Sequence, residues 1–154
     1  MRNRKAKRRI VIVSGGFDPI HVGHIRYIKA ASRLGDTLFA IANSDAFLKR
    51  KKNYAFMSAD ERQEILRSIK GVDRVVLSID KDQTVSATLR QIHKRYGAAN
   101  KLIFAKGGDR TKENIPEMGV CSELNIEVVF GVGGGKAQSS SHLVKRIKRR
   151  KIAK

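Results

Sequence analysis

Two histidines, His21 and His24, stand three residues apart at the start of a predicted helix. They follow the segment 15–20, Gly-Gly-Phe-Asp-Pro-Ile, which comes directly after the apolar run 10–13. Glycines in such a turn let a phosphate approach the backbone, and a helix start adds unpaired N–H groups and a positive dipole end. Because residues i and i+3 share a helix face, both imidazoles can donate hydrogen bonds to phosphoryl oxygens. The segment predicts a nucleotide-phosphate site.

Two other interpretations of the histidine pair remain open at this point. The pair could ligate a metal, but a closed zinc site needs about four ligands. The other candidate ligands form no pair of their own: His93, Cys121 and His142. The pair could also be structural, with no chemistry. We expect no metal held by protein ligands.

The segment Gly-Gly-Phe-Asp followed by His-Val-Gly-His resembles the H-x-G-H signature of the cytidylyltransferase-like nucleotidyltransferases. That family includes glycerol-3-phosphate cytidylyltransferase and the sugar-phosphate adenylyltransferase that makes ADP-heptose. The resemblance extends from about Ile10 to Ile147. It implies that His21 and His24 stabilise transition-state charge, and that the nucleotide also contacts Gly15, Gly16, Phe17, Asp18 and Gly23.

The resemblance assigns two further catalytic residues, Lys51 and Arg62. Residues 43–58 look like the family's loop after its second strand, whose lysines reach the triphosphate, and Lys51 falls on one of them. The second expected lysine falls on Asn53, where Lys52 or Arg50 could replace it. Arg62 would place the acceptor phosphate. The alternatives are a solvated basic loop and a surface arginine paired with an acid one helical turn away.

Two later segments complete the implied nucleotide site. Lys-Gly-Gly-Asp at 106–109 resembles the ADP-heptose branch, which implies contacts by Gly107 and Asp109; the alternative is a tight turn with a helix-capping aspartate. Ser139, Ser140 and Ser141 stand at a predicted helix start, which suits a triphosphate and equally a plain N-cap. The family's arginine upstream of these serines falls on Gly134, and Lys136 is the nearest substitute.

Strand and helix patterns alternate along the chain. They predict an α/β fold: a Rossmann-like doubly wound sheet of about five parallel strands in a single domain. We expect strands at 10–14, 37–42, 74–79, 101–105 and 126–131, and helices at 22–34, 58–70, 84–96, 116–124 and from 139 or 140. The motifs then meet at the carboxyl ends of the strands.

Local signals refine these helices. Ile25 and Ile28 are expected on the buried face of the first, with Gly35 after it. Ser58 and Glu61 form a capping box at the start of the second. Residues 43–57 are expected to form a polar, lysine-rich loop.

The charge is unevenly distributed. The 154 residues carry a net charge of +19, with six basic residues in 1–9, seven in 145–154 and no acid in either segment. We therefore expect a basic tail at 1–9, a nucleotidyltransferase domain at 10–145 and a basic tail at 146–154. The tails are either solvated ends, contacts for nucleic acid or anionic lipid, or an import signal.

The single cysteine, Cys121, excludes an internal disulfide and fits a reducing, cytoplasmic compartment. No apolar run approaches membrane-spanning length.

The resemblance implies an enzyme. It would move a nucleoside monophosphate from ATP or CTP to a small phosphorylated acceptor, a sugar 1-phosphate or a polyol phosphate, with release of pyrophosphate. Mg²⁺ would bridge phosphate oxygens, and a homodimer is implied. The alternative is a nucleotide-fold module that binds nucleic acid or a ribonucleoprotein through its basic termini.

Overall fold

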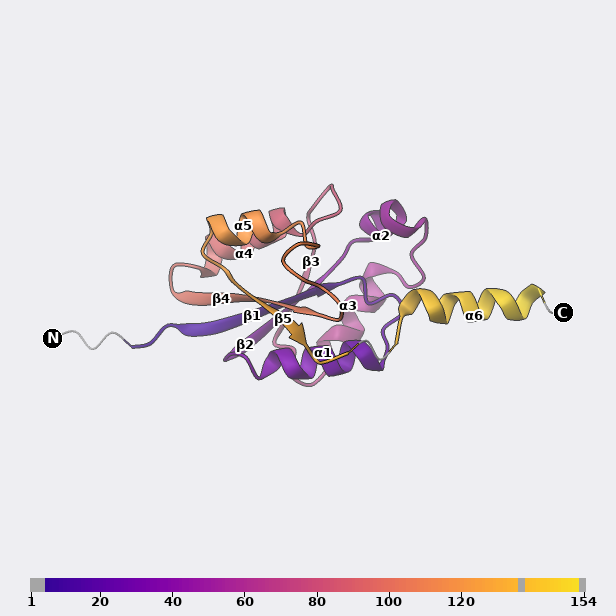
Figure 1. The fold of residues 1–154 in the computed structure, drawn as a ribbon, viewed down its shortest axis with the longest axis horizontal. Coiled ribbons are helices and arrows are strands. Elements are labelled where there is room, and N and C mark those ends of the chain that lie inside the picture. The colour runs from indigo at the N-terminus through magenta and orange to yellow at the C-terminus, as the bar shows by residue number, and fades with distance from the viewer. Residues whose placement is uncertain (1–4, 136–137, 153–154) are drawn as a thin grey trace.

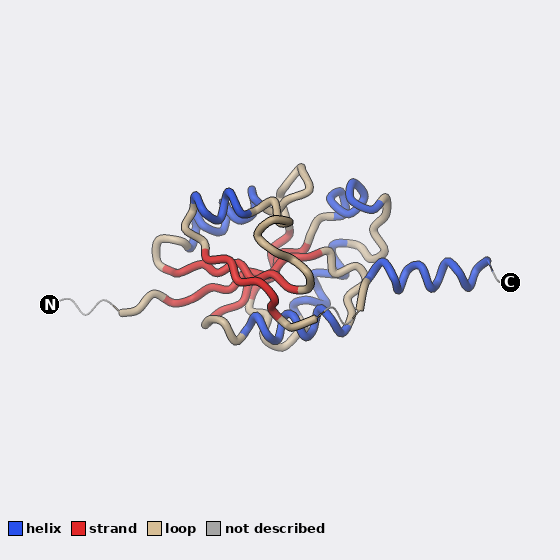
Figure 2. Tube along the Cα trace, in the orientation of Figure 1, coloured by secondary structure: helices blue, strands red, loops and turns tan. Residues whose placement is uncertain are grey.

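Five parallel strands form the centre of the molecule (Figure 2). The computed structural model describes residues 5–135 and 138–152. The strands are β1 (Arg8–Gly15), β2 (Thr37–Ala42), β3 (Arg74–Leu77), β4 (Asn100–Gly107) and β5 (Glu127–Val132). Across the sheet the strands lie in the order β3-β2-β1-β4-β5, so the direction in which successive strands are added reverses between β1 and β4. This confirms the predicted doubly wound α/β fold, and in such sheets the ligand crevice lies at the reversal point.

Alternate residues of β1 face opposite sides of the sheet, as strand geometry requires. Ile10 and Ile12 lie in one buried cluster, together with Leu89 and Ile92. Val11 and Val13 lie in the second cluster, whose helical members include Ile28, Ala31 and Leu66. Both faces of the central strand are therefore dry, which explains why its sequence is an unbroken apolar run.

The helices cover these two faces (Figure 1). On one face lie α4 (Ser86–Tyr96) and α5 (Met118–Glu123), and on the other lie α1 (Val22–Ser32) and α3 (Ala59–Arg67). The predicted capping box of α3 is present: Ser58 Oγ accepts from Glu61 N, and Glu61 Oε2 accepts from Ser58 N.

The predicted loop over 43–57 contains a helix, α2 (Asp45–Lys52). Ser44 caps its start by accepting a hydrogen bond from Phe47 N, and Asn53 ends it in the left-handed region at φ 68°. Phe47 and Leu48 form its buried face. The prediction was wrong because the run of four cations at the helix end conceals this short apolar face.

Three other expectations need correction. Ile25 is 39% exposed, whereas Ile28 is completely buried, so only the second lies on the inner face of α1. That helix ends at Ser32, before Gly35, with Arg33 as its C-cap. Pro116 precedes α5, whose N-cap is Glu117.

A strand and a helix cross the boundaries expected between the domain and its basic ends. Strand β1 includes Arg8 and Arg9 of the expected N-terminal tail. The last helix, α6 (Ser140–Ile152), continues without a break through residue 146 and points away from the body beyond the carboxyl ends of the strands (Figure 1). No helix within residues 5–135 and 138–152 combines the length and apolar character needed to cross a membrane.

Candidate active site

A cavity of about 680 Å³ lies at the carboxyl ends of β1 and β4, where the sheet reverses. The β1–α1 turn, α2, the loop after β4, the loop after β5 and the start of α6 all contribute to its wall. The predicted site residues that line it are His21, His24, Lys51, Gly15, Gly16, Gly23, Gly107, Asp109, Ser139, Ser140 and Ser141. Segments far apart in the sequence therefore meet at one cavity, as predicted.

The two histidines form the start of α1 through their own capping box. His21 Nδ1 accepts a hydrogen bond from Gly23 N at 3.0 Å, and His24 Nδ1 accepts from His21 N at 3.2 Å. Their rings stack with centroids 3.9 Å apart. A Cβ on Gly23 would lie 2.8 Å from His21 Cε1, so this position has no room for a side chain. The Nδ1 atoms thus hold the helix start, and both rings are fixed beside the cavity.

His24 is neutral at ordinary pH. Burial, followed by the charges of His21 and Lys52, lowers the pKa of His24 from 6.5 to about 3. Since Nδ1 accepts a hydrogen bond, the neutral ring carries its proton on Nε2. His24 is therefore a neutral, oriented N–H donor at the cavity wall.

Lysine side chains supply the positive charge. Lys51 of α2 lines the cavity, and burial together with Arg110 lowers its pKa. Lys52 is used differently: its ammonium donates to Asp18 O at 2.8 Å and lies 3.3 Å from Asp18 Oδ2. Of the two neighbouring lysines, Lys51 is the one that lines the cavity.

The serines join α6 to the first turn of the site. Ser139 Oγ accepts from His142 N, so Ser139 caps the helix. Ser140 Oγ donates to Pro19 O at 2.8 Å, which ties α6 to the β1–α1 turn. The start of α6 and the start of α1 therefore face the same cavity, and both present helix N-termini to it.

The end of β4 and the loop after it lie beside the neighbouring strand β5. A Cβ on Gly107 would lie 2.9 Å from Val132 O, so this glycine permits the close approach of β5. Asp109 is exposed at the cavity, and its carbonyl oxygen accepts a hydrogen bond from Asn114 Nδ2. The Asp109 carboxylate remains at the cavity wall.

Comparison with known proteins identifies the chain. The family model described as cytidylyltransferase-like matches residues 12–134. The chain belongs to the cytidylyltransferase-like family. The resemblance predicted from the H-x-G-H segment is confirmed, and with it the assignment of the chain to a family of nucleotidyltransferases.

A curated relative is the bifunctional protein HldE of Syntrophotalea carbinolica, 32% identical over 150 residues, which is 94% of this chain and 28% of the relative. The chain thus spans little more than a quarter of that protein's length.

Two solved structures share the fold. The lipopolysaccharide core biosynthesis protein from Thermoplasma volcanium has a TM-score of 0.63 at 23% identity, covering 81% of this chain and 96% of its own. A bifunctional NMN adenylyltransferase/ADP ribose pyrophosphatase from Francisella tularensis, complexed with AMP and a manganese ion, has a TM-score of 0.65 at 17% identity. The second match covers 90% of this chain and 41% of that one.

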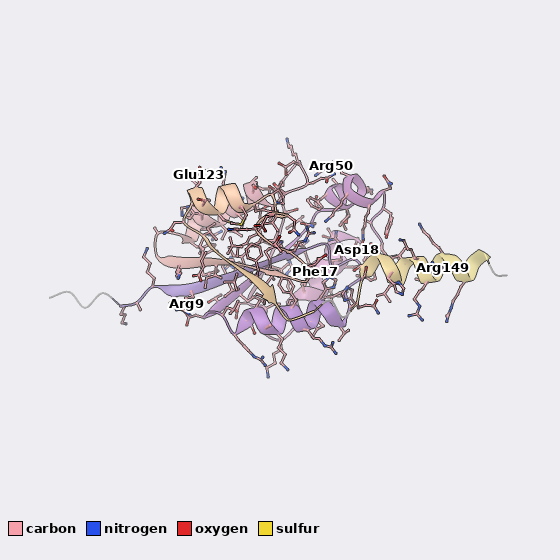
Figure 3. All side chains as sticks on the ribbon, in the orientation of Figure 1. Arg9, Phe17, Asp18, Arg50, Glu123 and Arg149 are labelled. Atoms are coloured by element: carbon pink, nitrogen blue, oxygen red, sulfur yellow. The ribbon has the colours of Figure 1, made fainter. Side chains whose placement is uncertain are left out.

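Three residues that the family resemblance places at the ligand lie outside the cavity wall. Phe17 and Asp18 are each 1% exposed and point into the body, near the base of α6 (Figure 3). Phe17 packs in the core against the His24 ring edge, with φ at 51°. Asp18 accepts hydrogen bonds from Phe56 N at 2.7 Å and Met57 N at 2.6 Å. In this structure both residues support the turn rather than the cavity surface.

Arg62 is the clearest departure from expectation. The residue is 1% exposed, and its guanidinium donates to four oxygens: Met57 O, Gly16 O, Asn43 O and Asp45 Oδ1. It is neither a surface arginine nor part of the cavity wall. The predicted contact with an acceptor phosphate does not fit this placement, because the guanidinium joins the β1 turn to α2 and α3.

Sequence reasoning missed Arg110, Lys106 and Glu117 at the cavity. Gly134, where the family's arginine is absent, also lines it, while Lys136 lies outside the described residues. Arg110 thus brings a guanidinium to the cavity from a different loop. Its position one residue after the Lys-Gly-Gly-Asp segment was the available signal.

Proposed function

We propose that this chain is a nucleotidyltransferase that moves a nucleoside monophosphate from ATP or CTP to a small phosphorylated acceptor. The observation that carries the proposal is the state of His24. The capping box holds this neutral imidazole as an Nε2–H donor at the cavity wall, and the starts of α1 and α6 face the same cavity. Such a donor strengthens its hydrogen bond as negative charge develops on a phosphoryl oxygen. The family assignment and the curated relatives support the same reaction.

The reaction proceeds by in-line displacement. An oxygen of the acceptor phosphate attacks the α-phosphorus, the bond from that phosphorus to the bridging oxygen breaks, and pyrophosphate leaves with the electron pair. His21 and His24 stabilise the charge on the α-phosphoryl oxygens. Lys51 and the α6 start, Ser139–Ser141, hold the pyrophosphate portion. Catalysis then consists mainly of positioning and electrostatics, with no covalent enzyme intermediate.

The remaining cavity residues suit the nucleoside. Gly15, Gly16 and Gly107 let the ligand approach the backbone. Asp109 accepts hydrogen bonds from ligand hydroxyl groups. Gly23 serves indirectly, since its missing side chain leaves room for the His21 ring.

Magnesium fits this site as an ion carried by the triphosphate. Within the described part of the chain, no group of three His, Cys, Asp or Glu residues could hold a metal. The phosphate oxygens would supply most of its ligands, and Asp109 would be an exposed carboxylate available to it at the cavity wall. When bound, Mg²⁺ offsets the charge of the phosphate oxygens. The Francisella structure that shares this fold is complexed with AMP and a manganese ion.

The test is pyrophosphate release from purified protein with Mg²⁺, using ATP and CTP against a panel of sugar 1-phosphates and polyol phosphates. The informative variant is His24→Asn, because the Asn Oδ1 can replace Nδ1 as the acceptor for His21 N while the Nε2 donor is lost. We expect acceptor-dependent release that falls about 100-fold or more in the variant. Release that is equally fast in His24→Asn would contradict the assigned role.

The same protein is proposed to be cytoplasmic and to form a homodimer, and light scattering would test the dimer.

The basic ends of the chain provide a second proposed contact, with polyanions such as RNA. Along α6 the cations Lys145, Arg146, Lys148, Arg149 and Arg150 are exposed, and Arg149 lies on the part of the helix that extends beyond the body (Figure 3). Replacing Arg146, Arg149 and Arg150 with Gln should weaken RNA binding and its salt dependence. Unchanged anisotropy titrations would exclude that contact.

A further inference from the structure

Lys106 is a cation that the proposed chemistry has not yet used. It is the penultimate residue of β4, its side chain is partly buried, and it lines the cavity. Its ammonium lies 3.4 Å from Ser14 Oγ and 4.8 Å from the centroid of the Phe104 ring. Across the described residues, no carboxylate lies within 4.0 Å of this ammonium. A charged amine with so few partners in a cavity wall is costly unless a ligand completes its environment.

Two further cations lie at the same cavity as Lys106. Lys51 of α2 and Arg110 of the loop after β4 both line the cavity and both repel the charge of Lys106. Glu117 is the carboxylate that faces them, and its Oε1 already accepts a hydrogen bond from Val85 N at 3.1 Å. Three cations from three segments therefore line the cavity beside two acidic residues, Glu117 and Asp109, which leaves an excess of positive charge.

We propose that Lys106 and Arg110 form the subsite for the acceptor's phosphate, and that Lys51 serves both this phosphate and the triphosphate. This inference rests on the proposed nucleotidyl transfer, which must bring two polyanions into contact. The triphosphate has the histidine pair and the starts of α1 and α6. The second anion needs cations of its own, and the Lys106 ammonium lies beside Ser14, the residue before the glycine turn. The ligand class is a phosphate monoester dianion.

The protonation of Lys106 gives a second, independent readout. Burial, then Arg110 and Lys51, lower the pKa of Lys106 to about 8, while Glu117 and Cys121 act in the opposite direction. The ammonium is therefore mostly charged at pH 7 and mostly neutral at pH 9. Phosphate binding at this subsite should weaken as the pH rises through about 8, although the dianion fraction of inorganic phosphate itself increases over that range.

The test uses inorganic phosphate as the probe and the 154-residue chain saturated with Mg²⁺ and the α,β-methylene analogue of ATP or of CTP, whichever it binds, and phosphate binding is followed by NMR. We compare Lys106→Met with wild type, and use Lys49→Met as the matched control because Lys49 is exposed on α2 and lies outside the cavity wall. We expect saturable phosphate binding that weakens about tenfold in Lys106→Met and stays unchanged in Lys49→Met. Nucleotide affinity should change less than twofold in both.

Several outcomes would overturn the subsite. One is failure of phosphate to bind the nucleotide-saturated wild type. Another is equally tight phosphate binding by Lys106→Met. A matching loss of nucleotide affinity in Lys106→Met would assign the lysine to the triphosphate instead. Lys106→Arg checks both folding and charge: it should retain phosphate binding and lose less of it between pH 7 and pH 9 than wild type does, and an identical loss contradicts the proposal. Failure of the wild type to bind nucleotide would count against the proposed function rather than the subsite.

Discussion

Replacing Arg62 with methionine tests whether this residue holds the fold or a substrate. The guanidinium donates to three backbone carbonyls and to Asp45 Oδ1, and the side chain is completely buried. Methionine fills much of the same volume but leaves those oxygens without their charged donor. Removing one partner of a buried charge pair costs about 3–5 kcal/mol. We take the lower end, about 3 kcal/mol, because the Asp45 side chain is 39% exposed and regains water.

That loss is large enough to measure by thermal unfolding. For a chain of this size, 1 kcal/mol corresponds to about 2–4 °C in Tm, so Arg62→Met should lower Tm by about 6–12 °C. Arg62→Lys keeps the charge but cannot donate in four directions, so its Tm should fall by an intermediate amount. An unchanged Tm for Arg62→Met, combined with a raised KM for the acceptor alone, would refute this reasoning and restore the phosphate contact.

Two further perturbations follow from buried polar groups. Asp18→Asn places an amide N–H₂ against Phe56 N or Met57 N and removes the charge opposite Lys52, so it should cost about 2–4 kcal/mol in chemical denaturation; a loss below 0.5 kcal/mol would show that the loop readjusts freely. Acidification should also destabilise the protein: the unfolded His24 takes up a proton near pH 6.5 whereas the folded one does so at about 3, so stability falls as the pH falls through that window. Between pH 6.5 and pH 5 this amounts to at most about 2 kcal/mol, and urea titrations should show a smaller drop in His24→Asn; an equal drop in both proteins would contradict the buried, neutral imidazole.

The sequence predicted the sheet well because its strands and turns carry strong local signals. The strand at 37–42 matches β2 to the residue, and Ser58 with Glu61 marks the start of α3. The helix α2 was missed because its apolar face has only two buried residues, Phe47 and Leu48, beside a run of cations. Periodicity cannot reveal a helix of two turns under such charge.

The site was predicted in outline but not in the division of roles. A motif brings a residue to the right region of the fold, yet it does not tell whether the side chain points to the ligand or supports the loop. Arg62, Phe17 and Asp18 point inward, and they fix the turn that presents the histidines. For Asp18 and Arg62 that direction depends on hydrogen bonds with residues 43–57, which the motif itself does not include. Lys106 and Arg110 reach the cavity for the same nonlocal reason.

The pH dependence of turnover distinguishes neutral histidine donors from charged ones. Lys51, Lys106 and Arg110 already supply positive charge to the cavity, so a neutral His24 adds direction rather than further charge. With the pKa of His24 at about 3, its protonation cannot produce an acidic limb near pH 6.5 in kcat/KM of the free enzyme. The limb should instead follow the second ionisation of the acceptor phosphate, near pH 6. A phosphonate analogue of the acceptor, whose second pKa is higher, should move the limb upward by the same shift. A limb that stays at the same pH with both acceptors would mean that a protein group titrates there, and would contradict its assignment to the acceptor phosphate.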